Sequence, residues 1–296
     1  KELTKMKKYI ILFPLYNDWT SLWKLCKEIN DHIKALNAKF SFLFINDAST
    51  EKRSKYELSL TNIGSIKVIN MKTNHLSGRC IATGLKYISE KEDCDYVIVM
   101  DADGEDKPET FVELFKKSLE SPNKTIVVNR VQRSENFFYK LMYKMHKMIT
   151  FIFTGKLIKF GNFVCLPKEH INDLVSKGSL WNCFSATIEK MLKNKISMNA
   201  NRGKRYFGTS KTSYLKLIHH SFTIMSVFID KVFFRTLLFS LIYFLIIYGK
   251  ISFFNLFPLL ILFIFLLTIF IISKRKNLTA LQNFSKNIKD IEVIKK

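Results

Sequence analysis

Apolar runs alternate with polar stretches through the first 130 residues, at two different spacings. Short runs rich in β-branched and aromatic residues, such as 8–14 and 40–45, have the length of strands, whereas Leu22, Leu25 and Ile29 recur at helical spacing. The alternation continues, predicting strands over 65–71, 96–100 and 125–128 and helices over 78–89 and 108–119. This succession predicts an α/β fold with a mostly parallel sheet covered by helices on both faces.

The composition changes sharply after residue 231. Residues 232–248 and 251–273 are almost entirely Phe, Leu and Ile, and about 20 apolar residues suffice to cross a bilayer. The tight link Gly249-Lys250 predicts a hairpin of two transmembrane helices, and Arg235 is expected to reach toward the headgroups. Basic residues flank both outer ends, which predicts an integral protein of the inner or plasma membrane with the soluble body and both termini in the cytoplasm.

Two further helices are expected near the hairpin. Residues 137–153 interleave Phe, Leu and Met with lysines on one face, which is typical of a membrane-surface helix and equally of a packed helix with a solvated face. Residues 214–234 have similar character and lead into the first span. The predicted domains are a soluble body, 1–212, a juxtamembrane amphipathic helix, 213–231, two spans, 232–273, and a polar cytoplasmic tail, 274–296, expected as a short helix or as disordered.

Four of the predicted strands are followed by polar loops. These loops contain Tyr16-Asn17-Asp18, Asn46-Asp47-Ala48-Ser49, Lys72-Thr73-Asn74 and Asp101-Ala102-Asp103. Ligands of open parallel sheets bind at the carboxyl ends of the strands, so these loops are the expected site. Neither a P-loop nor a Gly-x-Gly-x-x-Gly sequence follows any strand, so phosphate binding there would need a metal ion or arginines.

The densest acidic run begins at Asp101, directly after the buried strand 96–100. In an extended segment alternate residues project to the same side, so Asp101 and Asp103 can face one ion and Glu105 continues the period. Mg²⁺ prefers carboxylate, phosphate and water oxygens. An isolated Asp-x-Asp is more often a turn with solvated acids, but the position after a strand favours a site for Mg²⁺ or Mn²⁺.

The net charge of +22 fits an anionic lipid or an anionic substrate. No nucleic-acid motif accompanies it, so no nucleic-acid partner is expected. Eight of the 47 basic residues are arginine, and the arginine fork matches phosphate oxygens. The residues predicted to bind an acceptor phosphate near the membrane are Arg130, Arg133, Arg202, Arg205, Ser210 and Lys211, with Arg133, Arg205 and Lys211 as the main candidates.

Five motifs, in this order along the chain, resemble the family 2 glycosyltransferases. They are Tyr9 to Asp18, Ile45 to Ser49, Asn74 to Leu85 with Arg79 and Gly84, Val99 to Glu109, and Arg205 to Lys211. Within that family the chain is most similar to the polyprenyl-phosphate (dolichol-phosphate) sugar transferases, which the C-terminal two-span hairpin also resembles. The resemblance covers roughly residues 8–273.

The resemblance implies a Rossmann-like, GT-A type nucleotide-binding domain. Donor-binding residues are then Pro14, Tyr16, Asp18, Asp47, Arg79, Asp101 and Ala102, the metal ligands are Asp101, Asp103 and Glu105, and the catalytic residues are Asp103, Arg133 and Arg205. The chain departs from the family pattern, with Asn17-Asp18 for Asn-Glu, Asn46-Asp47 for Asp-Asp, Leu76 for a glycine and Glu105 for a frequent Gln. These departures leave the base and the sugar open.

The expected reaction is inverting hexosyl transfer from a nucleotide-diphosphate sugar to a membrane polyprenyl phosphate, for cell-envelope glycan assembly. One alternative is a same-fold transferase acting on a hydroxyl of a glycolipid or polysaccharide, with Glu105, Asp106 or Glu189 as the base. A second alternative is a non-catalytic membrane scaffold that binds anionic lipid. A homo-oligomer is also left open.

Overall fold

The computed structural model divides the chain into two compact units. The described residues are 6–53, 60–131, 137–208 and 214–296, with side chains left out at 137–140 and 214–216. One unit comprises Lys1–Ser134, Lys159–Ser210 and Leu278–Lys296, and the other comprises Glu135–Ile158 and Lys211–Asn277. The C-terminal residues Leu278–Lys296 therefore belong to the same unit as the N-terminal part of the chain.

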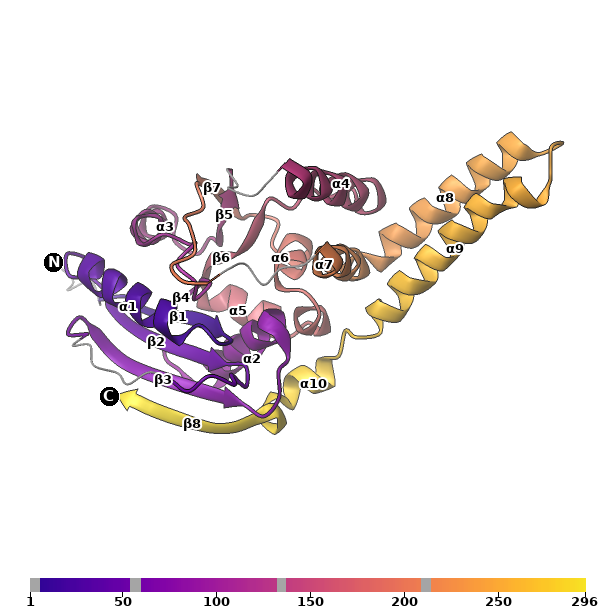
Figure 1. Ribbon diagram of the computed structural model, residues 1–296. Helices are drawn as coiled ribbons and strands as arrows, with labels where there is room; N and C mark the ends of the chain where they lie inside the picture. The colour runs from indigo at the N-terminus through magenta and orange to yellow at the C-terminus, as the bar shows by residue number, and fades with distance from the viewer. Residues whose placement is uncertain (1–5, 54–59, 132–136, 209–213) are drawn as a thin grey trace. The chain divides into compact units, whose positions relative to one another are not determined.

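Within the described ranges, the first unit contains one eight-stranded sheet in the order β7-β5-β6-β4-β1-β2-β3-β8 (Figure 1). Its strands are β1 (Lys8–Leu15), β2 (Lys39–Asn46), β3 (Ile63–Met71), β4 (Tyr96–Val99), β5 (Ile126–Arg130), β6 (Phe160–Pro167), β7 (Ile196–Ala200) and β8 (Ile288–Lys295). β1 pairs in parallel with β2 and β4, β2 with β3, and β5 with β7. β6 is antiparallel to β4 and β5, and β8 is antiparallel to β3. The sheet is therefore mixed, and every strand except β6 and β8 runs in one direction.

Helices cover both faces of the sheet (Figure 1). They are α1 (Trp19–Ile33), α2 (Leu76–Lys91), α3 (Pro108–Glu120), α5 (Lys168–Val175), α6 (Phe184–Met191) and α10 (Leu278–Gln282), with 3-10 turns at Gly178–Trp181 and Phe284–Asn287. The rings of Tyr9 and Phe115 lie 5.1 Å apart, so odd-numbered side chains of β1 face α1 and α3. On the other face a Cβ at Gly84 of α2 would lie 2.5 Å from Leu12 Cδ1. Because alternate residues point to opposite faces, β1 contributes to both cores, which explains its continuous apolar run.

The predicted α/β alternation through residue 130 is confirmed. The pattern gave no assignment for residues 155–212, where the structure has β6, α5, α6 and β7. The tail after residue 274 was expected as a short helix or as disordered. It contains α10, the 3-10 turn at Phe284–Asn287 and β8, which adds an edge strand beside β3. Ile291 and Val293 of β8 are 43% and 48% exposed, so this edge strand buries little apolar surface.

The second unit is helical. It contains α4 (Phe137–Thr154), α7 (Tyr214–Val227), α8 (Ile229–Ile247) and α9 (Phe253–Ser273), so the helix expected over 214–234 ends at Val227. Met225, Val232 and Ile269 form its buried core. Arg235 Nη1 donates to the carbonyl oxygens of Phe151 and Ile152 at 3.2 and 2.6 Å. This arginine caps the end of α4, and its expected approach to the headgroups stays a prediction.

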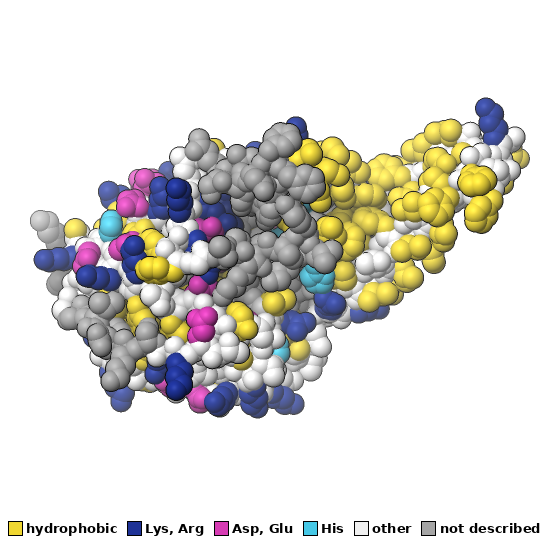
Figure 2. Space-filling model, in the orientation of Figure 1, with side chains coloured by type: hydrophobic (Ala, Val, Ile, Leu, Met, Phe, Trp, Pro, Cys, Tyr) yellow, Lys and Arg dark blue, Asp and Glu magenta, His cyan; other side chains and the backbone are white. Residues whose placement is uncertain are grey.

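In the described part of the chain, one helical stretch, Phe253–Gln282, is long and apolar enough to cross a membrane. Figure 2 shows hydrophobic side chains gathered over α8 and α9, and Phe253 and Phe254 are more than 80% exposed. α8 begins with Asp230, Lys231 and Arg235, whose charges set it apart from the uncharged α9. The predicted second span thus lies in a suitable helix, and the first span stays a prediction.

Candidate functional site

Five carboxylates and three arginines form one network at the carboxyl ends of the strands. Its members are Asp18 after β1, Asp101, Asp103, Glu105 and Asp106 after β4, Arg130 at the end of β5, and Arg202 and Arg205 after β7. These four strands run in the same direction, so their carboxyl ends lie along one edge of the sheet. The topology therefore brings together residues that are far apart in the sequence.

Asp101 is held by three side chains. Arg130 Nη2 donates to its Oδ2 at 3.1 Å, Asn162 Nδ2 of β6 donates to its Oδ1 at 2.8 Å, and Arg202 Nη2 lies 3.7 Å from Oδ2. Burial by itself would raise the pKa of Asp101, but the charges of Arg130 and Arg202 outweigh it and hold this pKa below its usual value. Asp101 is therefore a stable anion at neutral pH.

Arg205 joins the two acidic loops. Its Nη1 donates to Asp103 Oδ2 at 3.1 Å, its Nη2 donates to Asp18, and its Nε donates to the carbonyl oxygen of Phe207 at 2.9 Å. Burial and then the charge of Asp101 raise the pKa of Asp103. Neighbouring Arg205 lowers that pKa in turn, so the guanidinium helps to keep Asp103 ionised.

Glu105 and Asp106 complete the acidic run. Glu105 pairs with Arg202, and burial raises the pKa of Glu105. The Asp106 side chain is only 4% exposed; its Oδ2 accepts the backbone N–H of Asp101 at 3.1 Å and its Oδ1 lies 3.8 Å from Arg130. Burial raises the pKa of Asp106 to about 6. Asp106 thus acts as an internal support for the loop that carries Asp101.

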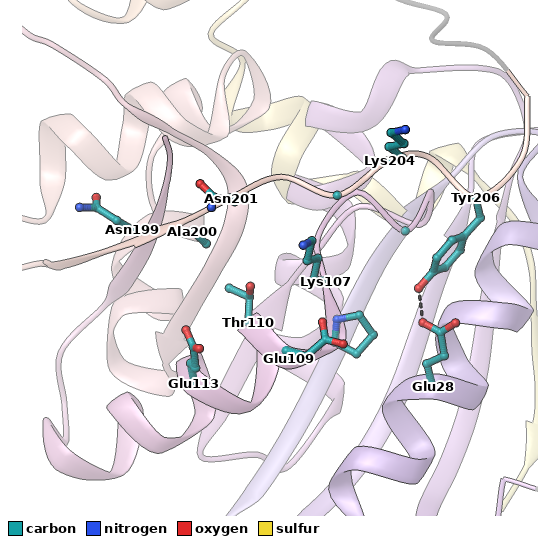
Figure 3. Close-up of a pocket in the computed structure, with 13 residues that line it drawn as sticks. Glu28, Lys107, Glu109, Thr110, Glu113, Asn199, Ala200, Asn201, Lys204 and Tyr206 are labelled. Atoms are coloured by element: carbon teal, nitrogen blue, oxygen red, sulfur yellow. Dashed lines mark hydrogen bonds between the residues drawn. The ribbon is translucent and has the colours of Figure 1, made fainter. Parts of the chain in front are cut away.

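The segment that carries Arg202 and Arg205 is docked onto the acidic loop by its backbone. The N–H of Gly203 donates to the Glu105 carbonyl at 2.8 Å, and the N–H of Tyr206 donates to the Asp103 carbonyl at 3.0 Å. The Tyr206 hydroxyl donates to Glu28 of α1, as Figure 3 shows. These contacts fix the two arginines against the acids.

A cavity of about 550 Å³ lies beside the docked segment (Figure 3). Its lining includes Lys107 and Thr110 at the start of α3, Lys204 and Tyr206 of the docked segment, and Glu28 of α1. Gly104, in the loop that begins at Asp101, is also part of the lining.

Asp47, predicted to bind the donor, serves as a helix cap. It is 3% exposed, and its two carboxylate oxygens accept the backbone N–H groups of His75 and Leu76 at 2.6 and 2.8 Å, at the start of α2. Leu76 has φ +68°, in the left-handed region that favours glycine. This conformation gives a physical reason for the glycine that the family pattern has at this position.

The other predicted donor-binding residues occupy different environments. Pro14 and Ala102 are buried, and Tyr16 is 38% exposed. Arg79 on α2 lies over the Trp181 ring, 5.4 Å from its centroid. The predicted acceptor residues Arg133, Ser210 and Lys211 lie outside the described residues.

The predicted metal ligands fit a divalent cation in chemistry and charge. The five carboxylates and three arginines of the network carry a net charge of −2 when all are ionised, and carboxylate oxygens are suitable ligands for Mg²⁺ or Mn²⁺. Among the described residues, however, no three Asp, Glu, His or Cys side chains converge closely enough to hold a metal ion. Arg202 and Arg205 bind the same acids, so these arginines would have to turn away from a bound cation.

A family model described as glycosyl transferase family 2 matches residues 10–180. The chain belongs to glycosyl transferase family 2. The match includes β1, the loop after β2 and the acidic loop after β4, which supply Asp18, Asp47 and Asp101 to Asp106. The chain is therefore a glycosyltransferase that uses a nucleotide-sugar donor.

Solved structures of two transferases share the fold. Glucosyl-3-phosphoglycerate synthase from Mycobacterium tuberculosis, in complex with Mn²⁺, UDP and glucosyl-3-phosphoglycerate, is 11% identical with a TM-score of 0.54, over 76% of this chain and 80% of that chain. Mannosyl-3-phosphoglycerate synthase from Rubrobacter xylanophilus is 14% identical with a TM-score of 0.52, over 75% and 72%. The first unit thus has the GT-A type of mixed α/β fold.

The sequence did not reveal every member of the site. Asn162 had no signal, because residues 155–212 carried no strand assignment and its approach to Asp101 depends on β6 pairing with β4. Tyr206 directly follows Arg205 in a motif that resembles the family, and this adjacency was the available signal. Its bond to Glu28 depends on how α1 packs, which the spacing of residues does not specify.

Proposed function

We propose that this chain transfers a sugar, with inversion, from a nucleotide-diphosphate sugar to a membrane polyprenyl phosphate. The observation that carries the proposal is the gathering of Arg130, Arg202 and Arg205 beside Asp101 and Asp103. The chain otherwise uses lysine for most of its positive charge. One guanidinium group can donate hydrogen bonds to two oxygens of the same phosphate, so this cluster suits an acceptor that carries a phosphate.

On the donor side, Asp101, Asp103 and Glu105 would hold Mg²⁺ or Mn²⁺. The cation, when bound, stabilises the negative charge that grows on the departing nucleoside diphosphate. Asp18 and Asp103 share Arg205, so the guanidinium of Arg205 connects the loop after β1 with the loop after β4. The complex of glucosyl-3-phosphoglycerate synthase with Mn²⁺ and UDP supports this assignment of donor and metal.

The environments of the acids favour an acceptor that needs no general base. A phosphate is already ionised, whereas a hydroxyl must lose a proton as it attacks. Of the three candidate bases, Asp106 is buried and accepts the Asp101 N–H, and Glu105 pairs with Arg202. Glu189 of α6 pairs with Lys195 at 2.8 Å. Each of these carboxylates already has a cationic or N–H partner.

The path of the chain supports a hairpin that crosses the membrane twice. The chain leaves the first unit near residue 210 and returns to it at residue 278, where β8 pairs with β3. A single crossing by α9 would leave β8 on the opposite side of the bilayer from β3. If α9 crosses, therefore, a second helix of the same unit must cross as well. We propose that this helix is α8, which directly precedes α9, so that both ends of the hairpin lie on the same side of the bilayer.

The two helices differ in the length of their uncharged part. α9 has 21 residues, about 32 Å at 1.5 Å per residue, which matches the bilayer core of about 30 Å. The uncharged part of α8, residues 236–247, is about 18 Å long. Arg235 would then lie within the apolar layer, where its bonds to the carbonyls of Phe151 and Ile152 offset the cost of its burial.

The direct test is a transfer assay on membranes that contain the full-length protein. Labelled UDP-glucose, GDP-mannose and related sugar nucleotides are incubated with Mg²⁺ or Mn²⁺ and with polyprenyl phosphate or 3-phosphoglycerate. We expect the label in an organic-soluble, mild-acid-labile product. Acid-stable lipid product would select the hydroxyl acceptor, and water-soluble product formed only with 3-phosphoglycerate would select the acceptor named for the two solved relatives.

A further inference from the structure

The last strand of the chain is hydrogen-bonded by its side chains to β3. Asp290 lies opposite Asn70 in the antiparallel register of β8 and β3. Asn70 Nδ2 donates to Asp290 Oδ1 at 2.5 Å and to Glu292 Oε1 at 2.6 Å. Residues of β8 thus accept hydrogen bonds from both hydrogens of the Asn70 amide. This fixes the orientation of the amide, because its oxygen must point away from β8.

The Asn70 oxygen continues the chain of hydrogen bonds into the loop after β2. It accepts a hydrogen bond from Asn46 Nδ2 at 2.8 Å, and Asn46 Oδ1 accepts the backbone N–H of Ser49 at 3.1 Å. Ser49 Oγ in turn accepts the backbone N–H of Asn17 at 3.0 Å, in the loop after β1. The side chains of Asn70, Asn46 and Ser49 therefore connect β8 to the loops after β2 and β1.

The two loops are also bound to each other. Asn17 Oδ1 accepts the backbone N–H groups of Thr50 and Glu51 at 2.8 and 3.1 Å, and Asn17 Nδ2 donates to Thr50 Oγ1 at 2.9 Å. Asn17 and Ala48 have φ of +52° and +55°, which L residues rarely adopt. Hydrogen bonds from outside the loops help to hold such conformations.

A second connection runs from β8 to the start of α1, next to the loop after β1. Glu292 Oε2 lies 2.8 Å from Arg53 Nη1, and the Arg53 guanidinium lies over the Trp19 ring, 5.7 Å from its centroid. Trp19 is the first residue of α1 and follows Asp18. Glu292 therefore belongs to both connections, through its hydrogen bond with Asn70 and its ion pair with Arg53.

We infer that β8 positions the donor-binding loops after β1 and β2. Asn70 and Glu292 are the residues that connect β8 to these loops. The inference rests on the proposed function for the role of these loops in binding the nucleotide. A preordered loop loses less conformational freedom when a ligand binds, so β8 acts on donor affinity. The chemical step, which involves Asp103 and the arginines, depends on it much less.

The attachment of β8 does not depend on these two side chains. Backbone pairing with β3 runs from Ile288 to Lys295, and Lys295 Nζ donates to the carbonyl oxygens of Leu60 and Ile63, both at 2.6 Å. Changing Glu292 can therefore remove its contacts with Asn70 and Arg53 while the strand stays in the sheet.

The test uses the full-length protein in detergent with Glu292→Ala and Asn70→Asp. Glu292→Ala removes the ion pair with Arg53 and one of the two hydrogen bonds that Asn70 donates to β8, and it leaves the bond to Asp290. Asn70→Asp keeps the shape of the side chain but turns its donor group into an acceptor that faces two carboxylates. Lys289→Ala, at an exposed position of the same strand, is the matched control. One measurement is amide hydrogen exchange at Ser49, Thr50 and Glu51 without ligand, and the other is binding of UDP-glucose and GDP-mannose with Mn²⁺.

We expect about five-fold faster exchange at these three amides, as the loss of roughly one hydrogen bond implies. The Kd and KM for the donor should rise by a similar factor, with kcat within about two-fold of wild type. Lys289→Ala should change neither exchange nor binding. Thermal stability measured on the same samples shows whether each variant is folded.

Two results would overturn the inference. Unchanged exchange in folded Glu292→Ala and Asn70→Asp would show that β8 does not order the loops. Faster exchange with unchanged donor affinity would show that loop order does not affect donor binding. Failure of the proposed function appears separately, as sugar transfer by the wild type to an acceptor other than polyprenyl phosphate.

Discussion

The ring of Tyr206 packs directly onto Gly104. A Cβ at Gly104 would lie 2.4 Å from two carbon atoms of this ring, and Gly104 has φ +84°. Lys24 lies over the ring, 4.4 Å from its centroid, and the Tyr206 hydroxyl donates a hydrogen bond to Glu28. Arg205 directly precedes this anchored tyrosine, so we expect the contact with Gly104 to help position the guanidinium at Asp103.

Gly104→Ala should therefore displace Tyr206 and the arginines beside it. We expect a loss of stability of about 1–3 kcal/mol, from the left-handed backbone and the overlap with the ring, and at least about a ten-fold lower kcat/KM. Thermal unfolding and steady-state transfer kinetics would measure the two effects. Gly64→Ala in β3 is the control, because its Cβ would make only ordinary contacts, the nearest at 3.5 Å. Equal kinetics for the two variants would show that Tyr206 does not position the arginines.

Arg130→Lys should weaken the acceptor more than the donor. Lysine keeps the positive charge beside Asp101 but loses the planar fork that binds two phosphate oxygens. We expect the acceptor KM to rise by about ten-fold, as the loss of one charged hydrogen bond implies, with a smaller rise in the donor KM. Initial rates measured against each substrate in turn would separate the two.

Gly161→Ala offers an independent check of the same arginine. A Cβ there would lie 2.9 Å from Arg130 Cζ, so it would displace the guanidinium without changing its chemistry. It should shift the acceptor KM in the same direction. A larger effect of either variant on the donor than on the acceptor would contradict the placement of Arg130 at the acceptor phosphate.

The buried Asp106 should give the protein a specific pH dependence. Burial raises its pKa from 3.8 to about 6 in the folded state, so the folded state binds its proton more tightly than the unfolded chain does. The stability that this proton contributes is present below about pH 4 and is lost as the pH rises through about 6. In Asp106→Asn this loss is absent.

The unfolding free energy of Asp106→Asn, relative to wild type, should therefore increase by about 1–3 kcal/mol between pH 4 and pH 7. Denaturant titrations at several pH values would show it. Comparing each variant with itself removes any constant cost of the substitution. A difference that stays flat or decreases with pH would rule out the raised pKa.

The turn between α8 and α9 should lie across the membrane from the first unit. Lys250→Cys should react with a membrane-impermeant maleimide in intact cells, whereas Ser285→Cys, in the segment that leads to β8, should react only after permeabilisation. The five native cysteines are buried and free, so they add little background. Protection of Lys250→Cys in intact cells would mean that the hairpin does not cross.

Much of the fold could be predicted from the sequence, because its signals are local. β1 and β4 are buried on both faces, so they appear as continuous apolar runs, and the alternating Asp101 and Asp103 directly follow one of them. β8 could not be predicted. Its residues alternate only weakly, and its place depends on β3 offering a free edge after the chain has passed through the second unit.

The composition of the site was predictable, but its internal pairing was not. Asp101 and Arg202 are 101 positions apart and meet only because β7 pairs with β5, which aligns their carboxyl ends. For Asp47, likewise, the sequence predicts the location but not the contacts. The sequence places it in a ligand-binding loop, but only the turn at Leu76 reveals that its two oxygens cap α2.

The most direct measurement is the mass and phosphorus chemistry of the lipid product. Purified protein is incubated with the sugar nucleotide that gives transfer, a divalent cation and polyprenyl phosphate, and the lipid is analysed by mass spectrometry and ³¹P NMR. We predict one added hexose and conversion of the phosphate monoester to a diester, both absent with Asp103→Asn. A lipid phosphate that stays a monoester while the sugar is transferred to a hydroxyl would contradict the account.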